Sequence, residues 1–270
     1  MSALELRSLR KVFERGTPNA KTALDSFSLS VADGEFITLL GSNGAGKSTL
    51  FNAILGKFRL DSGQVILDGE DITHWKDYAR ALHIGCLYQD PMRGTAPNMT
   101  IEENLALAYT RKAHRSFFAV NRRDSAYFRE LLSRLHLGLE DRMKTKMGLL
   151  SGGQRQAASL LMATIAEPKL LLLDEHTAAL DPGTAEKVLE LTRQVVAERK
   201  LTCMMITHNM RSALELGSRT ILMDSGRLVL DVSGGERARM TVEDLLKRFS
   251  ENAGRQLDSD RILLSGAKGQ

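Results

Sequence analysis

Hydrophobic and polar residues alternate in two segments near the start of the chain, residues 3–10 and 24–31. Such alternation is typical of half-buried β-strands. Residues 35–40 form a more continuously apolar run that opens into a glycine-dense turn, and apolar side chains then recur at helical spacing over residues 48–58. A further strand is predicted at residues 64–67, before an Asp-Gly turn. The pattern predicts an antiparallel β portion beside a strand, a glycine loop and a helix.

The pattern changes between residues 90 and 167, where strand signals disappear and helical periodicity dominates. Thr100 and Glu103 have the spacing of a capping box, which marks the start of a helix. Apolar residues at helical spacing predict a second helix over residues 127–137. A helical subdomain inserted at about residues 90–167 is the simplest interpretation.

Strands and helices alternate in the last third of the chain, beginning with a four-leucine run at residues 170–173 that predicts a strand buried on both faces. Alternation at this spacing predicts βαβ crossovers and a mainly parallel sheet. We therefore predict an α/β fold, as a single domain over residues 1–254 with a polar tail at 255–270. The other predicted elements are a helix with Val188, Leu191 and Val195 on one face, helices at 210–216 and 242–250, and strands at 203–207, 220–223 and 228–230.

Composition narrows the class of protein without identifying it. The chain has 270 residues, with 37 Lys and Arg against 33 Asp and Glu, a formal charge of +4, and 43% hydrophobic residues. These values exclude disordered and fibrous proteins. No apolar stretch approaches the ~18 residues of a membrane span, so we expect no membrane-crossing segment. Four surplus charges spread over this length form no binding surface for DNA or RNA unless they cluster, and no nucleic-acid partner is expected.

The turn after residues 35–40 has the residue pattern of a phosphate-binding loop. Glycines allow backbone amides to turn toward phosphate oxygens, and the N-terminus of the following helix adds its dipole. Lys47 can reach the outer phosphates, and the Ser48 hydroxyl can bind Mg²⁺. We therefore predict that the chain binds a nucleoside triphosphate. The predicted binding residues are Gly41, Ser42, Asn43, Gly44, Ala45, Gly46, Lys47, Ser48 and Thr49.

Two carboxylates, Asp174 and Glu175, come directly after the four-leucine strand. The carboxyl edge of a parallel sheet is where such folds present functional side chains. Asp174 is predicted to bind Mg²⁺, directly or through water. Glu175 is then available to orient or deprotonate an attacking water, which would make a nucleotide-binding protein a hydrolase.

The segment Leu-Ser-Gly-Gly-Gln at residues 150–154 forms a second candidate anion-binding helix start. Ser151 can cap the helix, while Gly152 and Gly153 leave the amides of the first turn unshielded before Gln154. This segment, downstream of a phosphate loop and upstream of an acidic strand, resembles the ATP-binding cassette (ABC) family of ATPases. The resemblance covers about residues 4–231. It implies ATP as the nucleotide, Mg²⁺ as its metal, ATPase activity, and a P-loop fold with a RecA-like core.

The resemblance also implies roles for residues outside these three motifs. Phe13 is similar in placement to the aromatic residue that stacks on adenine, although a core phenylalanine is the alternative. Gln89 resembles the glutamine that reaches Mg²⁺ and the attacking water, with a solvated glutamine as the alternative. Asp181 resembles the acidic residue of the loop that crosses to the other subunit. His208 resembles the histidine that contacts the γ-phosphate.

The partners are likewise implied by the resemblance. In the family, Ser151 and Gly153 serve the nucleotide bound by the opposite chain, so hydrolysis needs a homodimer or paired cassettes facing head to tail. The partners are then integral membrane permease subunits and, in the complete system, a periplasmic solute-binding protein. The expected location is peripheral, at the cytoplasmic face of the inner membrane. The sequences of residues 93–100 and 174–181 are similar to those of ATPase components from a group of bacterial importers with ribose- or branched-chain-amino-acid-type permeases. Aromatic amino acids are one substrate proposed for that group.

Two residues depart from the family pattern. His176 stands where family members commonly carry proline after the catalytic glutamate. We interpret it as a packing or hydrogen-bonding variant, because every catalytic role already has a candidate. Ala178 replaces a serine often found in the crossing loop. Basic residues with interleaved aromatics at 111–123 are interpreted as a solvated face, with contact to a permease or a lipid surface as the alternative hypothesis.

Three other functions remain open from the sequence. An ATPase for export or for lipid or lipoprotein release would carry much the same motifs. A nucleic-acid-associated ABC protein would be expected to have two cassettes or a long coiled coil, and the chain shows one phosphate loop and no sustained heptads. A non-hydrolysing regulatory protein is disfavoured by the presence of Lys47, Glu175 and His208.

Overall fold

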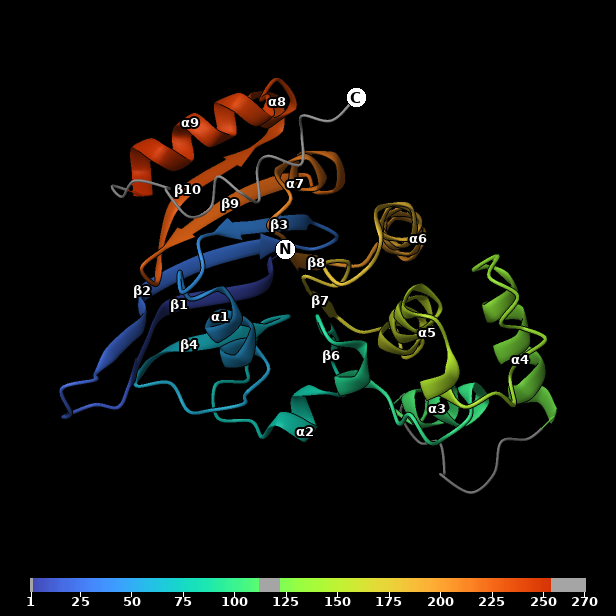
Figure 1. Cartoon of the computed structure of the whole chain (residues 1–270). Coiled ribbons are helices and arrows are strands. Elements are labelled where there is room, and N and C mark those ends of the chain that lie inside the picture. Colours follow the sequence, from blue (N-terminus) through green and yellow to red (C-terminus); the bar gives the residue numbers. More distant parts are fainter. Residues whose placement is uncertain (1, 112–121, 254–270) are drawn as a thin grey trace. The chain divides into compact units, whose positions relative to one another are not determined.

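The computed structural model describes residues 2–111 and 122–253 (Figure 1). The chain divides into two compact units. The first unit comprises Met1–Asp77 and Thr202–Gln270, and the second comprises Tyr78–Leu201. Within the described residues, no helix is long and apolar enough to cross a membrane.

An antiparallel sheet forms the N-terminal part of the first unit. Its strand order is β2-β1-β4-β5, and neighbouring strands are antiparallel. Leu4 in the first strand is fully buried and pairs with Val31 on one side and Leu67 on the other. The antiparallel β portion predicted from the alternating pattern is therefore confirmed. The strands are β1 (Ser2–Phe13), β2 (Lys21–Ala32), β4 (Ser62–Leu67) and β5 (Glu70–Asp71).

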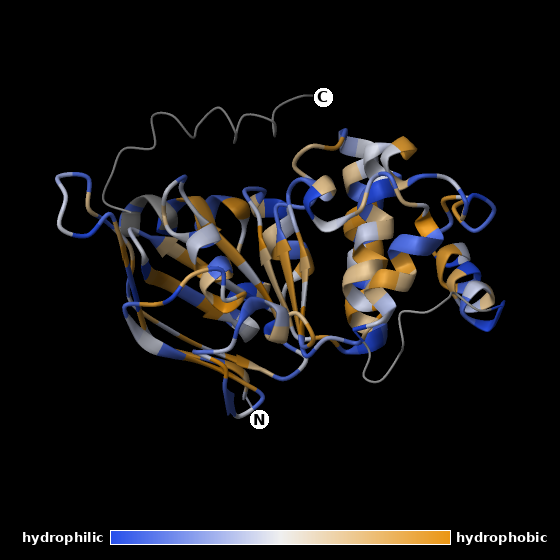
Figure 2. Cartoon of the chain, turned by 90° about the horizontal axis from the view of Figure 1, so that it is seen from below, coloured by the Kyte–Doolittle hydropathy of each residue, from blue (hydrophilic) through white to orange (hydrophobic). Residues whose placement is uncertain are grey.

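A second set of strands in the first unit is mainly parallel. Strand β3 (Phe36–Gly41) pairs in parallel with β8 (Cys203–Ile206) and with β9 (Arg219–Asp224). Strand β10 (Arg227–Ser233) is antiparallel to β9. Every residue of β3 and β8 is buried, and these strands are largely orange in the hydropathy colouring of Figure 2. This burial on both faces explains why their sequences are mostly apolar.

Helices flank this part of the first unit. Helix α1 (Lys47–Ile54) follows β3 after the glycine loop. A small apolar cluster joins Leu40 and Leu222 of the sheet to Met210, Ala213 and Leu245 of two later helices. The later helices of this unit are α7 (Met210–Leu216), α8 (Gly234–Ala238) and α9 (Val242–Ala253).

The second unit combines two parallel strands with helices around a separate core. Strands β6 (Ile84–Leu87) and β7 (Leu170–Asp174) pair in parallel. The core includes the fully buried Phe128 and Leu132 and apolar residues from the neighbouring helices. The helical elements are α2 (Asp77–Arg80, which begins one residue before the unit), η1 (Pro91–Gly94), α3 (Ile101–Tyr109), α4 (Arg122–Ser133), η2 (Met147–Leu149), α5 (Gly152–Thr164) and α6 (Pro182–Arg199).

The α/β fold class is confirmed, but the bounds of two predicted helices and part of the predicted buried face of a third were wrong. The helix predicted over 48–58 ends at Ile54, because Gly56 has φ +73°, a left-handed conformation that terminates helices. The helix predicted over 127–137 is present as α4, which begins and ends earlier, at Arg122 and Ser133. His136, with φ +53°, ends the turn that follows α4. In α6 the buried residues are Val188, Thr192 and Val196. Val188 was predicted correctly, whereas Leu191 and Val195 are half-buried, and Leu191 packs against the core of the second unit.

Two sequence predictions fall wholly or partly outside the described residues. The polar tail at 255–270 lies outside them, and so do residues 112–121 of the basic segment, with both of its phenylalanines. The predicted bounds of the single domain and of the helical insertion at about residues 90–167 stay predictions.

Candidate nucleotide-binding and catalytic site

Backbone geometry that excludes side chains shapes the phosphate loop in the first unit. Gly46, the residue that precedes α1, has φ +104°. A Cβ at Gly46 would lie 2.4 Å from the carbonyl oxygen of Ala23 in β2, and one at Gly41 would lie 2.5 Å from that of Met223 in β9. Carbonyl oxygens of neighbouring strands therefore occupy the space that a Cβ would need, and only glycine fits at these two positions.

Lys47 begins α1 and lies against the loop. Its side chain is buried, and its Nζ donates hydrogen bonds to the carbonyl oxygens of Gly41 at 2.7 Å and Ser42 at 3.0 Å. The positive charge is thereby fixed beside the amides of a loop that opens a helix, and the helix N-terminus adds to it. Ser48 is exposed and Thr49 is half-buried in the same first turn. The arrangement suits an anion with several oxygens.

His208 follows the strand next to the one that leads into the phosphate loop. Leu39 of β3 pairs with Ile206 of β8, and the amide of Thr207 donates to the Leu39 carbonyl oxygen at 3.2 Å. His208 and Gly41, each two residues beyond that pair, therefore leave neighbouring parallel strands at the same end. Asn209 then caps α7 by accepting a hydrogen bond from the amide of Ser212 at 3.0 Å.

Phe13 is the last residue of β1 and is 38% exposed. This exposure contradicts the alternative that Phe13 is a core residue. Its ring packs edge-on against Phe58 with 5.5 Å between ring centroids, and the Nζ of Lys11 lies 5.4 Å from the Phe13 centroid. The exposed ring is thus fixed in orientation by a neighbour, as a stacking surface for a base would need to be.

Gln89 and the two carboxylates lie at one edge of the strand pair in the second unit. Leu87 of β6 pairs with Leu173 of β7, so Gln89 and Glu175, each two residues later, leave the strands at the same end. Asp174 closes β7. Glu175 has φ +44°, uncommon for a residue with a side chain, and its carbonyl oxygen accepts a hydrogen bond from the amide of Ala178 at 3.0 Å. Backbone conformations of this kind concentrate at functional sites.

His176 is buried directly beside this turn, with 3% of its surface exposed. Its Nε2 lies 3.1 Å from the Oγ1 of Thr192 in α6. Burial lowers the pKa of His176 to about 4, so the ring is neutral at physiological pH. The interpretation of His176 as a packing and hydrogen-bonding residue is confirmed.

The segment at residues 150–154 starts α5 with a complete capping box. The Oγ of Ser151 accepts a hydrogen bond from the amide of Gln154 at 3.3 Å, and the Oε1 of Gln154 accepts one from the amide of Ser151 at 3.3 Å. Gly152 and Gly153 occupy the first turn between them. The start of the helix is therefore well defined while carrying no side chain at two consecutive positions.

Gly153 packs against the start of α6. A Cβ on Gly153 would lie 2.1 Å from the Cγ2 of Thr184. Asp181 caps α6, since its Oδ1 accepts a hydrogen bond from the amide of Thr184 at 3.0 Å. Hydrogen bonds from Thr184 lower the pKa of Asp181, so its carboxylate stays ionised. The loop that begins α6 and the segment that begins α5 are therefore in direct contact within one chain.

The sequence profile of the ABC transporter family matches residues 24–178, from β2 to the turn after Glu175. The chain belongs to the ABC transporter family. It is 42% identical over 246 residues to a tyrosine transport ATP-binding protein of Clostridioides difficile, a match that covers 91% of this chain and 98% of that protein. It is 33% identical over 248 residues to a xylose/arabinose import ATP-binding protein of Sulfolobus acidocaldarius, covering 92% and 94% of the two chains.

Solved structures of ABC cassettes have the same fold. A dimeric post-hydrolysis cassette bound to ADP and Pi matches with a TM-score of 0.74 and 27% identity, covering 85% of this chain and 98% of that chain. A second cassette of an ABC transporter matches with a TM-score of 0.76 and 25% identity, covering 92% and 99%. The chain is therefore an ABC ATPase with the P-loop fold, as its motifs indicated.

The structure groups the expected ABC residues by unit. The phosphate loop, Phe13 and His208 belong to the first unit, whereas Gln89, Asp174, Glu175, Asp181 and residues 151–154 belong to the second. The individual roles of these residues stay predictions. Sequence reasoning missed Thr184 and Thr192, which lie eight residues apart on the face of α6 that also carries Val188. Helical spacing could have placed them on one face, but it gives no information about their contacts.

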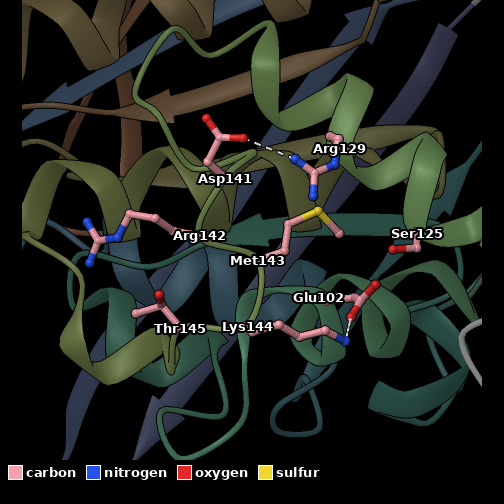
Figure 3. Close-up of a pocket in the computed structure, with 8 residues that line it drawn as sticks. All are labelled: Glu102, Ser125, Arg129, Asp141, Arg142, Met143, Lys144 and Thr145. Atoms are coloured by element: carbon pink, nitrogen blue, oxygen red, sulfur yellow. Dashed lines mark hydrogen bonds and ion pairs between the residues drawn. The ribbon is translucent and has the colours of Figure 1, made fainter.

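A polar pocket of about 330 Å³ lies elsewhere in the second unit and contains none of the predicted site residues (Figure 3). Glu102, buried in the first turn of α3, is ion-paired with the exposed Lys144. Burial raises the pKa of Glu102, but hydrogen bonds from Lys144 and Ser125 outweigh it and leave the pKa below its ordinary value. Across the pocket, Arg129 pairs with Asp141 at 3.1 Å. These pairs join α3, α4 and the segment before α5.

Proposed function

We propose that this ABC ATPase is the energy-coupling subunit of a membrane importer and works as a head-to-tail dimer with two ATP molecules at its interface. The similarity to a tyrosine transport ATP-binding protein carries this proposal, because it extends over 98% of that protein. The presence of Lys47, Glu175 and His208 in the expected sequence contexts supports hydrolysis rather than regulatory binding alone.

ATP binding is assigned to the first unit. The amides of residues 41–46 and the Nζ of Lys47 bind the phosphate oxygens, and Thr49 adds a second hydroxyl beside Ser48 in the first turn of α1. Lys47 exchanges its hydrogen bonds to the neutral Gly41 and Ser42 carbonyl oxygens for hydrogen bonds to the negatively charged outer phosphates, in which donor and acceptor are both ionised. The exposed Phe13 ring stacks on the adenine.

Mg²⁺ fits the donor set of the residues proposed to bind it. Ser48, Gln89 and Asp174 offer a hydroxyl, an amide oxygen and a carboxylate, and Mg²⁺ prefers such hard oxygen ligands together with substrate phosphates. When bound, Mg²⁺ neutralises charge that develops on the phosphate oxygens. Of the two neighbouring carboxylates, Asp174 would bind the metal and Glu175 would stay available as a base.

Hydrolysis is assigned to Glu175, with Gln89 and His208 in supporting roles. Glu175 orients a water and accepts its proton as that water attacks the γ-phosphate. The Gln89 amide positions the same water, since Gln89 leaves β6 at the end where Glu175 leaves β7. His208 donates a hydrogen bond to the γ-phosphate. As the water oxygen bonds to the γ-phosphorus, the bond from that phosphorus to the bridging oxygen breaks, so the products are ADP and inorganic phosphate.

The dimer places Ser151 and Gly153 of one chain on the ATP bound by the other. Two features support this assignment. The start of α5 is capped and carries glycines, which is the arrangement of an anion-binding helix N-terminus. A cassette of the same fold is dimeric in a post-hydrolysis state bound to ADP and Pi. Asp181, at the start of α6, would cross to the opposite subunit.

We infer an amino acid, of aromatic type, as the transported solute, delivered by a periplasmic solute-binding protein to an integral permease. The relative named for tyrosine transport supports this inference. The cassette would then work at the cytoplasmic face of the inner membrane. Export and lipid or lipoprotein release are the alternatives that an experiment must separate.

Co-purification from native membranes tests the proposal. A tagged Glu175→Gln protein is captured with ATP and Mg²⁺, and every chain that co-purifies is identified. We expect to recover an importer-type permease, together with a solute-binding protein that binds labelled tyrosine. Because Lys47→Ala should weaken ATP binding, the Lys47→Ala/Glu175→Gln protein, captured at an ATP concentration that saturates only the Glu175→Gln protein, is the control for nucleotide-dependent capture. Recovery of an exporter or lipid-release permease, or of ribosomal or DNA-associated proteins alone, contradicts the importer assignment.

A further inference from the structure

Helix α6 connects the turn that carries Glu175 to the start of α5. Two positions on one side of α6, Thr184 and Thr192, make the connection, and both of these contacts lie within the second unit. The contact near the middle of α6 reaches His176, and the contact at its first turn reaches Gly153. In the proposed dimer these two ends serve different ATP molecules.

The hydrogen bonds at the His176 end have one consistent direction. The Oγ1 of Thr192 donates to the carbonyl oxygen of Val188 at 2.8 Å. Because a hydroxyl has a single proton to donate, Oγ1 must accept the contact from His176 Nε2, 3.1 Å away. His176 therefore carries its proton on Nε2 and donates it to α6. Both groups are buried, so water cannot replace either partner without disturbing the packing.

The backbone between His176 and α6 transmits this attachment to Glu175. Glu175 precedes His176 and has φ +44°. Its turn is closed by the hydrogen bond from the Ala178 amide, and a second turn follows, in which the Leu180 amide donates to the Thr177 carbonyl oxygen at 3.1 Å. A non-glycine residue in the left-handed region persists only where its surroundings fix it. Within the described residues, the side chain of His176 anchors this part of the chain on α6 through its hydrogen bond to Thr192.

At the first turn of the same helix, the contact is van der Waals packing between Thr184 and Gly153. The methyl group of Thr184 lies where a side chain on Gly153 would have to be, 2.1 Å from a Cβ built there. Thr184 is also the residue whose amide Asp181 caps. A shift of α6 along or about its axis would therefore move the capping loop and the start of α5 together, since close-packed interfaces do not deform continuously.

We propose that His176 is a positioning residue for the hydrolysis of ATP. Its hydrogen bond to Thr192 fixes the Glu175 turn on α6, so that Glu175 keeps a fixed position relative to the helix start at Ser151–Gly153. This inference rests on the proposed role of Glu175 as base. The attachment acts on the placement of Glu175 and not on the phosphate loop, so it governs kcat and leaves the binding of ATP alone.

Matched pairs of variants of the full-length chain test the hydrogen bond. His176→Gln keeps an N–H donor near the Nε2 position, whereas His176→Met has a similar length and no donor. Thr192→Ser keeps the hydroxyl, and Thr192→Val removes it at nearly constant shape. For each variant we would measure kcat and KM for ATP, and the Tm to confirm that the assay temperature lies well below unfolding.

We expect His176→Met and Thr192→Val each to lower kcat about tenfold with KM changed less than about twofold, because misplacing a catalytic group by a fraction of an ångström costs rate rather than affinity. His176→Gln and Thr192→Ser should recover most of the rate. The double variant His176→Met/Thr192→Val should be no slower than either single variant, since both remove the same bond.

Four results would overturn the inference: an unchanged kcat in His176→Met, a rise in KM at unchanged kcat, equal loss in the Gln and Met variants, or additive losses in the double variant. Glu175→Gln is assayed in parallel. If Glu175→Gln still turns over ATP, the proposed role of Glu175 fails. If Glu175→Gln is inactive while the His176 and Thr192 variants match the wild type, only the positioning role fails.

Discussion

The phosphate loop of the first unit and the catalytic edge of the second unit are built by different means. The loop is shaped by backbone: glycines at 41 and 46 lie against carbonyl oxygens of neighbouring strands that leave no room for a Cβ. The catalytic edge is shaped by side chains: His176 is hydrogen-bonded to Thr192, Asp181 caps α6, and Ser151 and Gln154 cap α5. Binding should therefore depend on main-chain conformation, and turnover on individual side-chain contacts.

The largest expected effect separates turnover from binding at the catalytic edge. Glu175→Gln removes the base but keeps the size of the side chain, so the ATPase rate should fall by about 10³-fold while ATP affinity stays within about twofold of the wild type. Single-turnover hydrolysis and equilibrium nucleotide binding measure the two quantities. Normal turnover in this variant would refute the assignment of Glu175 as base.

The second effect tests the phosphate loop from the opposite side. Lys47→Ala removes a charged donor from the loop, and ATP should bind about 10- to 100-fold more weakly, as expected for hydrogen bonds to charged groups. Lys57→Ala is the matched control, because Lys57 belongs to the same unit and is exposed in an ion pair with Asp77. Affinity that is undiminished in Lys47→Ala, or equally diminished in both, would count against the phosphate role.

The third effect probes the contact between α5 and α6. Gly153→Ala forces a methyl group toward Thr184, and the free energy of unfolding should fall by about 1–3 kcal/mol. Thr184→Ser removes the Cγ2 that lies 2.1 Å from the added Cβ, so the double variant should recover much of the loss. Gly152→Ala meets only the Cδ2 of Leu180 at 3.1 Å and should cost less. Denaturant unfolding of the wild type, the two glycine variants, Thr184→Ser and the double variant measures these differences, and equal losses at 152 and 153 would contradict the packing.

The smallest effect concerns the polar pocket of the second unit. Glu102→Gln replaces the carboxyl group, whose pKa in the folded protein lies below the ordinary 4.5, with an uncharged amide. A lowered folded-state pKa means that the ionised form stabilises the protein above the unfolded pKa, and that this contribution disappears as pH falls through the folded pKa. The Tm of Glu102→Gln should therefore be a few degrees below wild type at pH 7 and equal to it at strongly acidic pH.

Asp141→Asn is the control for that measurement, because Asp141 is 81% exposed in its pair with Arg129. Exposed pairs contribute little to stability, so its Tm should match the wild type throughout. A difference between Glu102→Gln and wild type that persists unchanged at acidic pH would show that the carboxylate charge is not the cause.

The sequence predicted the elements whose signals are local. The strands at 35–40 and 170–173 and the helix at 210–216 are marked by continuous apolar runs or by helical spacing, and the structure has them within a residue or so. The capping box at Thr100 was likewise predicted from two residues and is present. The end of α1 was not, since an apolar residue at 58 continues the helical pattern beyond the glycine that terminates the helix.

Long-range contacts in the site could not be predicted. The motifs identify Gly153 and Asp181 by type, but nothing in the spacing indicates that Thr184 touches the first and is capped by the second. His176 was recognised as unusual, yet its partner Thr192 lies sixteen residues away, on a helix whose predicted buried face did not include Thr192. Such contacts depend on how two helices pack, which local propensity does not determine.

The carbonyl oxygen of Ala23 has a consequence for how the protein folds. It lies 2.4 Å from the Cβ position of Gly46 and 2.7 Å from that of Gly226, and the Gly226 amide donates to the Ala45 carbonyl oxygen at 2.9 Å. Three segments up to about two hundred residues apart in sequence thus meet behind one loop. Closing contacts of such sequence separation is slow, so the phosphate loop should acquire its native shape late in folding, after the chain's C-terminal third has been synthesised.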